Sequence, residues 1–283
     1  MKIIQEIPAL KTEIRSYKQQ NQSIGFVPTM GFLHEGHISL LEEARKHHDK
    51  VVLSIFVNPL QFGPTEDLDR YPRDFKRDEQ IANELGVDLL FYPSVEEMYP
   101  TTPSMTIHVT QGVNVLCGAS RPGHFDGVTT VVMKLFMLVQ PDKAYFGQKD
   151  AQQVAVITNM VNMFNVPVEI VPCPTIREED GLAKSSRNVY LSALERLEAP
   201  SIYKTLHEAV LLMDEGETNP SRMIQFVQNK LQELPLAEID YIELLAYPSL
   251  HEVDEIKEAI VLAVALKYKK ARLIDNVIVN KGE

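Results

Sequence analysis

The chain has 283 residues, 45% of them hydrophobic, which is enough for one large domain or two modest ones with a buried core. Its 28 Lys and Arg residues against 39 Asp and Glu residues give a formal net charge of −11, which opposes general attraction to nucleic acid or to an anionic membrane surface. Cys117 and Cys173 lie far apart without CxxC spacing, so neither a zinc site nor a disulfide framework is indicated. We therefore expect a globular protein of the reducing cytoplasm.

The two ends of the sequence carry no pattern of an export or membrane segment. The first 18 residues are interrupted early by Glu6 and Pro8 and give no signal-peptide core. The apolar run AIVLAVAL (259–266) is far too short to span a bilayer. We expect neither export nor a membrane span.

Strand and helix patterns alternate along the first part of the chain. The short apolar run SIGFVPT (23–29) predicts a strand, and residues 38–48 have apolar positions at helical spacing. The continuous β-branched run that begins at Val51 and stops at Asn58-Pro59 predicts a strand buried on both faces. This alternation indicates parallel strands with right-handed crossovers, hence a Rossmann-like, doubly wound α/β sheet. Further helices are predicted at 73–86, within 127–141 and at 149–164, and further strands at 87–93, 143–147 and 166–172.

The pattern changes after residue 175. Helical segments at 192–216 and 220–234 precede three strand-like stretches at 238–245, 259–268 and 271–280. We therefore expect a Rossmann-like domain over residues 1–175 that binds nucleotide and substrate, followed by a smaller α+β lid domain over residues 176–283.

The stretch PTMGFLHEGHISLL (28–41) is the first candidate for chemistry. Ligands of an open parallel sheet bind beyond the carboxyl ends of its strands, where helix N-termini present unpaired N–H groups. If Gly36 and His37 begin the helix, His34 and His37 would flank its first turn, with Gly31 and Gly36 allowing the backbone to approach a phosphate closely. Imidazoles placed there would donate hydrogen bonds to phosphoryl oxygens that gain charge during transfer.

A simpler interpretation of the two histidines stays open. One would cap the helix and the other would be a surface residue, which is the better reading of a lone histidine. The glycines and the strand-to-helix context favour the phosphate site instead. A zinc site is not supported, because HExxH needs the second histidine one residue later.

Three further stretches carry polar side chains suited to binding. Asn58 and Gln61 directly follow a predicted buried strand and suit hydroxyl, carboxylate or amine groups, although for Asn58-Pro59 alone a turn is the better explanation. Lys149 at a helix start indicates an anion, and Gln153 lies one turn further, but a solvated lysine is equally consistent. KSSRN (184–188) combines two hydroxyls and two cations in a predicted loop, which suits a polyphosphate.

Other patterns carry less weight. Asp74 and Asp78 share a face of the predicted helix 73–86, where we favour a solvated surface over a metal site. The chain contains neither GxxxxGK[ST] nor GxGxxG, so neither a Walker ATPase nor an ordinary dinucleotide enzyme is supported.

Taken together, the stretches PTMGFLHEGH, SIFVNPLQF, DLDRYPR, RPGHFDGV, FGQKDAQQ and GLAKSSRN closely resemble the pantoate–β-alanine ligase (pantothenate synthetase) family. The first and last of them also resemble the HxGH and KMSKS-like signatures of the adenylate-forming nucleotidyltransferase superfamily. The resemblance covers most of the first predicted domain and the junction, and it is much weaker over the tail.

The resemblance implies an ATP-dependent ligase of pantothenate (vitamin B5) biosynthesis. The pantoate carboxylate would attack the α-phosphate of ATP to give pantoyl adenylate and pyrophosphate, and the amine of β-alanine would then release AMP and form the amide. Magnesium is expected with ATP, although the protein ligands are unknown and its contacts would be mostly phosphate and water. A homodimer is implied by the resemblance alone.

The resemblance also implies roles for individual residues. His34 and His37 would stabilise the transition-state phosphate, with His37 as proton donor, and Lys149, Ser185 and Arg187 complete the expected catalytic set. Gln61 and Gln153 would hold pantoate, with Asn58 and Gln61 near β-alanine. The residues expected around ATP are Met30, Gly31, Phe32, Leu33, His34, Glu35, Gly36, His37, Gly147, Gln148, Lys149, Asp150, Ile176, Lys184, Ser185, Ser186 and Arg187.

Lys184 departs from the family, which usually has methionine at this position, so its side chain either reaches the phosphates or points to solvent. Other activities also remain open at this stage. A nucleotidyltransferase would keep the nucleotide on its product, a tRNA-charging enzyme is disfavoured by the acidic balance, and a nucleotide sensor would bind ATP without consuming it.

Overall fold

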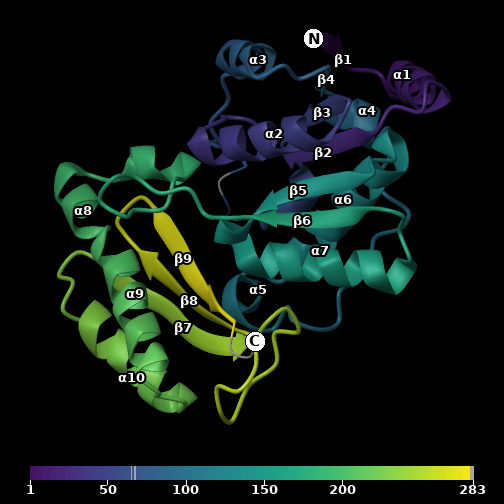
Figure 1. Ribbon diagram of the computed structural model, residues 1–283. Helices are drawn as coiled ribbons and strands as arrows, with labels where there is room; N and C mark the ends of the chain where they lie inside the picture. The colour runs from purple at the N-terminus through teal and green to yellow at the C-terminus, as the bar shows by residue number, and fades with distance from the viewer. Residues whose placement is uncertain (65, 67, 281–283) are drawn as a thin grey trace. The chain divides into compact units, whose positions relative to one another are not determined.

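A computed structural model describes residues 1–64, 66 and 68–280 of the chain (Figure 1). Asp67, the first residue of DLDRYPR, and the last three residues of the predicted second domain therefore lie outside the described residues. The chain divides into two compact units. The first consists of Met1–Val109, Arg121–Gln148 and Val156–Pro174; the second consists of Thr110–Ser120, Lys149–Ala155 and the chain from Thr175 onward.

The first unit contains a six-stranded parallel sheet, which confirms the predicted α/β class. The strand order is β1-β4-β3-β2-β5-β6. From β2 the chain proceeds toward one edge through β3 and β4, and it later returns to the other side of β2 to form β5 and β6. The strands are β1 (Lys2–Ile4), β2 (Ile24–Thr29), β3 (Lys50–Ile55), β4 (Leu89–Phe91), β5 (Lys143–Gly147) and β6 (Glu169–Cys173).

Helices cover both faces of this sheet, as the doubly wound arrangement requires. Neighbouring residues of a strand point to opposite faces, and β2 shows this with Phe26 and Val27. Val27 packs in a buried cluster with Leu41 of α2 (Glu35–His47), whereas Phe26 makes an edge-to-face contact with Phe136 of α6 (His124–Val139). The remaining helices of this unit are α1 (Ile7–Gln19), η1 (Pro59–Gln61), α3 (Phe75–Glu84) and α4 (Val95–Met98), and α7 (Ala151–Phe164) continues into it from the second unit.

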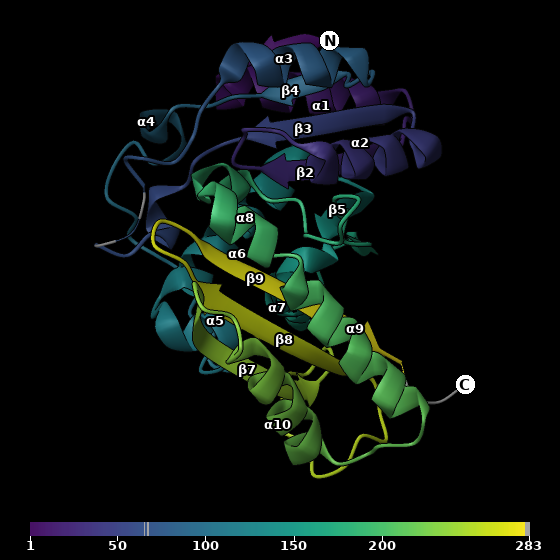
Figure 2. The same cartoon turned by 90° about the vertical axis from the view of Figure 1, so that its left-hand side faces the viewer.

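The second unit contains an antiparallel sheet in the order β7-β8-β9, with β7 at Glu238–Ala246, β8 at Ile260–Lys267 and β9 at Arg272–Val279 (Figure 2). Ile260, Leu262, Val264 and Leu266 pack into a cluster with the helices α9 (Ser201–Asp214) and α10 (Pro220–Leu231). Val261 and Ala263 of the opposite face pack with Leu116 of α5 (Leu116–Ser120) and Ala151. The run AIVLAVAL is therefore a central strand buried on both faces.

The predicted helix at 192–216 is two helices, α8 (Ala193–Glu198) and α9. Two 3₁₀ turns, η2 (Gln148–Asp150) and η3 (Ser186–Tyr190), complete the elements of the second half. Helix α6 begins three residues before the range 127–141 within which a helix was predicted. Across the described ranges, which omit residues 65, 67 and 281–283, no helix is long and apolar enough to cross a membrane.

Candidate active site

The carboxyl ends of β2, β3 and β5 meet at one edge of the parallel sheet, because β2 pairs with both β3 and β5. Met30 follows β2 directly, Asn58 follows β3 after two residues, and Gly147 is the last residue of β5. At this point the strand order reverses, which is where open α/β sheets bind their ligands. The predicted site residues of the first unit are thus gathered at a topological switch point.

His34 and His37 lie against each other at the start of α2, with ring centroids 4.1 Å apart. His34 is the N-cap of the helix, and its Nδ1 accepts a hydrogen bond from the N–H of Gly36 over 3.1 Å. Nδ1 of His37 accepts from the N–H of His34 over 3.3 Å. Because both Nδ1 atoms are acceptors, each neutral ring carries its proton on Nε2. His34 and His37 therefore cap the helix through Nδ1 and carry hydrogen-bond donors on Nε2.

The glycine between the histidines makes this arrangement possible. A Cβ atom at Gly36 would lie 2.9 Å from Cε1 and 3.0 Å from Nδ1 of His34. Any side chain there would push the His34 ring away from the N–H groups that it caps. The capping geometry thus explains the glycine of the HxGH signature. The same glycine also leaves room for a ligand at the helix N-terminus.

Asp78 corrects a prediction made from the sequence. We favoured a solvated surface for Asp74 and Asp78, but the Asp78 side chain is buried, with 1% of its surface exposed, and its carboxylate accepts hydrogen bonds from the backbone of the loop that precedes His34. Asp74 is exposed and caps α3. The signal was available, since Asp78 falls on the helical stripe that contains Phe75 and Ala82.

Asn58 and Gln61 are also buried, and their side chains are linked. Nδ2 of Asn58 donates to Oε1 of Gln61 and to the carbonyl of Gly127, each over 3.1 Å, while its Oδ1 accepts from the Tyr99 hydroxyl. Nε2 of Gln61 donates to Sδ of Met30 over 3.1 Å. A thioether sulfur is a weak acceptor, so a substrate oxygen would be a stronger partner for this amide.

Helix α6 holds the segment that carries these amides. Nδ1 of His124 donates to the Gln61 carbonyl over 2.8 Å, and Arg121 donates to the other ring nitrogen of His124 over 3.0 Å. A Cβ atom at Gly127 would lie 2.2 Å from the carbonyl oxygen of Leu60. The approach of α6 to the 58–61 segment therefore requires glycine at position 127, which explains part of RPGHFDGV.

Arg121 is itself fixed by Glu66, with Nε of Arg121 2.8 Å from Oε1. Burial alone would raise the pKa of Glu66, but the hydrogen bond and charge of Arg121 outweigh it, and this pKa lies below its ordinary value. The two residues thus form an ion pair that supports His124.

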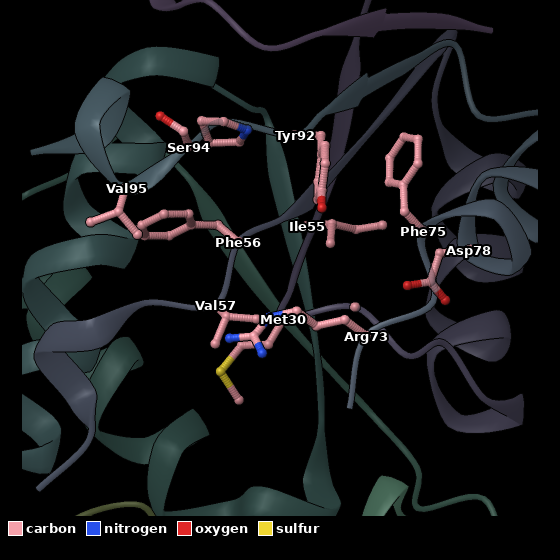
Figure 3. Close-up of a pocket in the computed structure, with 12 residues that line it drawn as sticks. Met30, Ile55, Phe56, Val57, Arg73, Phe75, Asp78, Tyr92, Ser94 and Val95 are labelled. Carbon is pink, nitrogen blue, oxygen red and sulfur yellow. The ribbon is translucent and has the colours of Figure 1, made fainter. Parts of the chain in front are cut away.

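A cavity of about 170 Å³ lies beside Met30 and Gly31 (Figure 3). Figure 3 shows Phe75 and Asp78 on one side of it and Ser94 and Val95 on the other. Its walls are mostly apolar side chains from the ends of β3 and β4, so it suits an apolar group next to the polar amides. The residues lining it are Met30, Gly31, Ile55, Phe56, Val57, Arg73, Phe75, Asp78, Tyr92, Pro93, Ser94 and Val95.

Gln148, which follows Gly147, belongs to the first unit, and the remaining predicted site residues belong to the second unit. Lys149 and Ser185 line one small cavity there together with Asn188 and Asp275. The Lys149 carbonyl accepts a hydrogen bond from the Asn276 amide over 2.9 Å, which ties the lysine's backbone to β9. Ser185 is the N-cap of η3 and accepts from the N–H of Arg187 over 3.2 Å. The structure thus brings Lys149 and the KSSRN segment together.

Lys184, the residue that departs from the family pattern, forms an ion pair with Glu178 over 2.8 Å. Its N–H also donates to the Ile176 carbonyl over 2.9 Å, so both ends of the residue are tied to the segment that precedes it. The sequence left two alternatives for this side chain, a phosphate or solvent, and the structure adds a third, the carboxylate of Glu178.

The adjacent glutamines of FGQKDAQQ differ in their surroundings. Gln152 is buried and bonds the carbonyls of Gly112 and Val115 at 2.9 and 2.8 Å, so it holds the segment before α5. Gln153, the predicted pantoate ligand, is half-buried.

Sequence reasoning missed two residues of the second unit. Asp275 is buried and receives two hydrogen bonds from Arg177, at 2.7 and 2.9 Å. Asn188 donates to the Ala183 carbonyl over 3.0 Å, while its Oδ1 is buried without a protein partner. The terminal position of Asn188 in KSSRN was a signal for it, whereas nothing local in LIDNV marks Asp275 as a partner of Arg177.

A family model for pantoate–β-alanine ligase matches residues 2–278 of this chain. The chain belongs to the pantoate–β-alanine ligase family. Its relatives in this family include the pantothenate synthetase of Halalkalibacterium halodurans, which is 60% identical over 277 residues and covers 98% of both chains. The pantothenate synthetase of Bacillus anthracis is 55% identical over 277 residues, again with 98% of each chain covered.

Solved structures of pantoate–β-alanine ligases share the fold. The pantothenate synthetase of Thermus thermophilus matches with a TM-score of 0.92 at 44% identity, covering 98% of this chain and 99% of that one. The pantoate–β-alanine ligase of Francisella tularensis, complexed with beta-gamma ATP and beta-alanine, matches with a TM-score of 0.81 at 36% identity, with 98% and 97% covered. The family thus accounts for both units of the chain.

Proposed function

We propose that this chain joins pantoate to β-alanine with ATP, through a pantoyl-adenylate intermediate. In the first step a carboxylate oxygen of pantoate attacks the α-phosphorus of ATP, and the bond to the bridging oxygen breaks to release pyrophosphate. In the second step the amine of β-alanine attacks the acyl carbon, loses a proton and displaces AMP. The observation that carries this proposal is the pair of histidines at the start of α2 whose Nδ1 atoms accept backbone hydrogen bonds, in a chain that matches the ligase family over residues 2–278.

The first step needs positioning and charge neutralisation more than covalent chemistry. His34 and His37 would donate from Nε2 to phosphoryl oxygens that gain charge as pyrophosphate leaves, and the N-terminus of α2 adds its positive end. We assign His37 as the proton donor. Because Met30 through Leu33 lead directly into this N-terminus, they would border the nucleotide together with Glu35 and Gly36.

The buried amides suit the two small substrates. Gln61 would exchange its weak contact to the Met30 sulfur for a pantoate oxygen. Both Nδ2 hydrogens of Asn58 are used within the protein, so we propose that Asn58 acts near β-alanine chiefly by holding Gln61. Gln153 completes the proposed pantoate contacts.

The residues of the second unit would hold the nucleotide. Lys149, Ser185, Ser186 and Arg187 supply cations and hydroxyls of the kind that bind phosphate. Gly147 and Gln148 of the first unit and Asp150, Ile176 and the backbone of Lys184 in the second complete the proposed ATP contacts.

Magnesium, oligomeric state and location complete the proposal. Over residues 1–64, 66 and 68–280, no group of three or more His, Cys, Asp or Glu side chains is arranged to hold a metal ion. We therefore propose that Mg²⁺ arrives with ATP, bound by phosphate oxygens and water. We also propose a homodimer, which the family resemblance supports, and a cytoplasmic location, which the two free cysteines support.

The test is to incubate the purified protein with ATP, magnesium and pantoate, with and without β-alanine, and to follow AMP, pyrophosphate and pantothenate by mass spectrometry. Pantothenate and AMP formed only with both substrates are the expected result. Intact ATP would point to a sensor, and nucleotide retained on the final product would point to a transferase.

The His37→Ala variant should lose maximal rate, and an effect confined to substrate affinity would contradict its assigned role.

A further inference from the structure

We propose that Asp78 is a positioning residue, whose carboxylate fixes the loop 31–33 so that the two histidines face the phosphates. The proposal rests on the proposed function, since it deepens the account of that same site. Asp78 lies 44 residues along the chain from His34, on the different helix α3.

The carboxylate of Asp78 accepts hydrogen bonds from two successive backbone N–H groups. Oδ2 accepts a hydrogen bond from the N–H of Phe32, and Oδ1 accepts from the N–H of Leu33, both over 2.7 Å. Hydrogen bonds to a carboxylate are stronger than those between neutral groups. With 1% of Asp78 exposed, water does not compete for these contacts. The next residue in the chain is His34, the N-cap of α2.

The loop 31–33, which Asp78 binds, has a strained backbone conformation. Gly31 has φ +81° and Phe32 has φ +53°, so two successive residues lie in the left-handed region. A non-glycine residue is strained there and persists only where its surroundings impose this conformation. Phe32 is half-buried, and the Arg77 guanidinium lies 5.5 Å from the centre of its ring. Helix α3 thus holds Phe32 by both backbone and side chain.

The packing around Gly31 leaves no room for a side chain at this position. A Cβ atom at Gly31 would lie 2.8 Å from Cγ2 of Ile55 and 2.9 Å from Oδ2 of Asp78. Asp78 and Gly31 also border the cavity beside Met30 (Figure 3). If the carboxylate were removed, the Phe32 and Leu33 N–H groups would both lose the acceptor that they now share. The expected consequence is a shifted loop and a displaced His34.

The test compares Asp78→Asn with Asp74→Ala. Both substitutions affect α3, but Asp74 caps the helix from an exposed position and bonds the N–H of Arg77 rather than the loop. In Asp78→Asn, the NH₂ group of the new side chain would face either the Phe32 or the Leu33 N–H. Two donors would then face each other, and that hydrogen bond would be lost. We expect the kcat of adenylate formation, measured by pyrophosphate exchange, to fall about 100-fold in Asp78→Asn, the size of effect that a displacement of about 1 Å produces. Asp74→Ala should retain its kcat despite a lower melting temperature.

A second readout separates positioning from general damage. When synthetic pantoyl adenylate is supplied, the second step bypasses the phosphoryl transfer, so Asp78→Asn should form pantothenate from it at close to the wild-type rate. Equal losses in both steps would overturn the proposal, and so would a wild-type kcat in the first step. If Asp78→Asn does not fold, Asp78→Glu serves in its place, because it keeps the carboxylate but moves it by one methylene. A wild-type enzyme that makes no pantothenate would instead refute the proposed function.

Discussion

The hydroxyl of Tyr99 donates a hydrogen bond to Oδ1 of Asn58 over 3.0 Å, so a residue at the end of α4 sets the orientation of a buried site amide. Burial raises the pKa of Tyr99 to about 12, so the hydroxyl keeps its proton at neutral pH. With Oδ1 fixed as the acceptor, Nδ2 of Asn58 must point to Gln61 and Gly127. The order of contacts runs from Tyr99 through Asn58 to Gln61.

We therefore expect Tyr99→Phe to raise the KM for pantoate and to lower the free energy of unfolding by about 1 kcal/mol, the usual contribution of one hydrogen bond. The measurement is steady-state kinetics with each substrate varied, together with denaturant unfolding. In an Asn58→Ala background the same change should have little further effect on KM, because its partner is already absent. Independent, additive effects would contradict the proposed order of contacts.

His34→Asn should separate the two functions of His34. Asparagine is among the best N-cap residues, so the unfolding free energy should change by less than about 0.5 kcal/mol. The variant lacks the Nε2–H donor, and pyrophosphate exchange should slow by about 100-fold, the effect of losing one donor to a developing charge. A fully active His34→Asn enzyme would show that His34 serves only the helix.

Lys149→Ala should sharply slow adenylate formation while leaving the fold intact. The contact of Asn276 is to the backbone carbonyl of Lys149, so the substitution preserves it. Lys143→Ala is a matched control, because Lys143 is a partly exposed lysine paired with Glu169 at the start of β5. Near-normal pyrophosphate release by Lys149→Ala at saturating substrates would reject its phosphate role.

Lys184→Met restores the residue that the family usually has, and we expect it to leave the KM for ATP almost unchanged. The ammonium group already pairs with Glu178, and both side chains are partly exposed. Exposed pairs of this kind contribute roughly 0–1 kcal/mol, so the melting temperature should change little. A marked rise in the KM for ATP, measured by isotope exchange, would show instead that Lys184 binds the phosphates.

Asp88 should make the stability of the first unit depend on pH. Burial by itself raises the pKa of Asp88. The Val51 N–H and the Arg45 and Lys50 side chains lower it by more, so the pKa of Asp88 lies below its ordinary value. Its contribution is therefore complete above the unfolded pKa of about 3.9 and is lost as pH falls through the folded pKa. In denaturant unfolding, Asp88→Asn should be less stable than wild type at pH 7, with a difference that narrows below pH ~4. A difference independent of pH would count against this assignment.

The sheet of the first unit could be predicted because hydrophobic pattern and turn residues act locally. The run from Val51 to Ile55 is continuous and β-branched, as a strand covered on both faces requires, and the structure confirms it as β3. The pattern of 259–266 also predicted a strand, but not what covers it. Leu116 and Ala151 come from distant parts of the chain, and no local signal links them to Val261.

The candidate site was predictable in its residue types and less so in its contacts. Glycine spacing and strand-to-helix context indicated His34 and His37, yet their mutual capping depends on side-chain rotamers that no spacing rule gives. Asp78 was misread as a surface residue because charge usually implies exposure. Its two partners are backbone N–H groups, which have no signature in a sequence.

Gly127 has a consequence for attempts to change the substrate range of this enzyme. Its Cα faces the backbone of Leu60 so closely that no larger residue fits, so that part of the wall behind Asn58 and Gln61 consists of main chain. Main-chain walls cannot be widened or narrowed by substitution. Directed evolution toward bulkier or smaller acids will therefore find its productive mutations among the side chains that line the Met30 cavity.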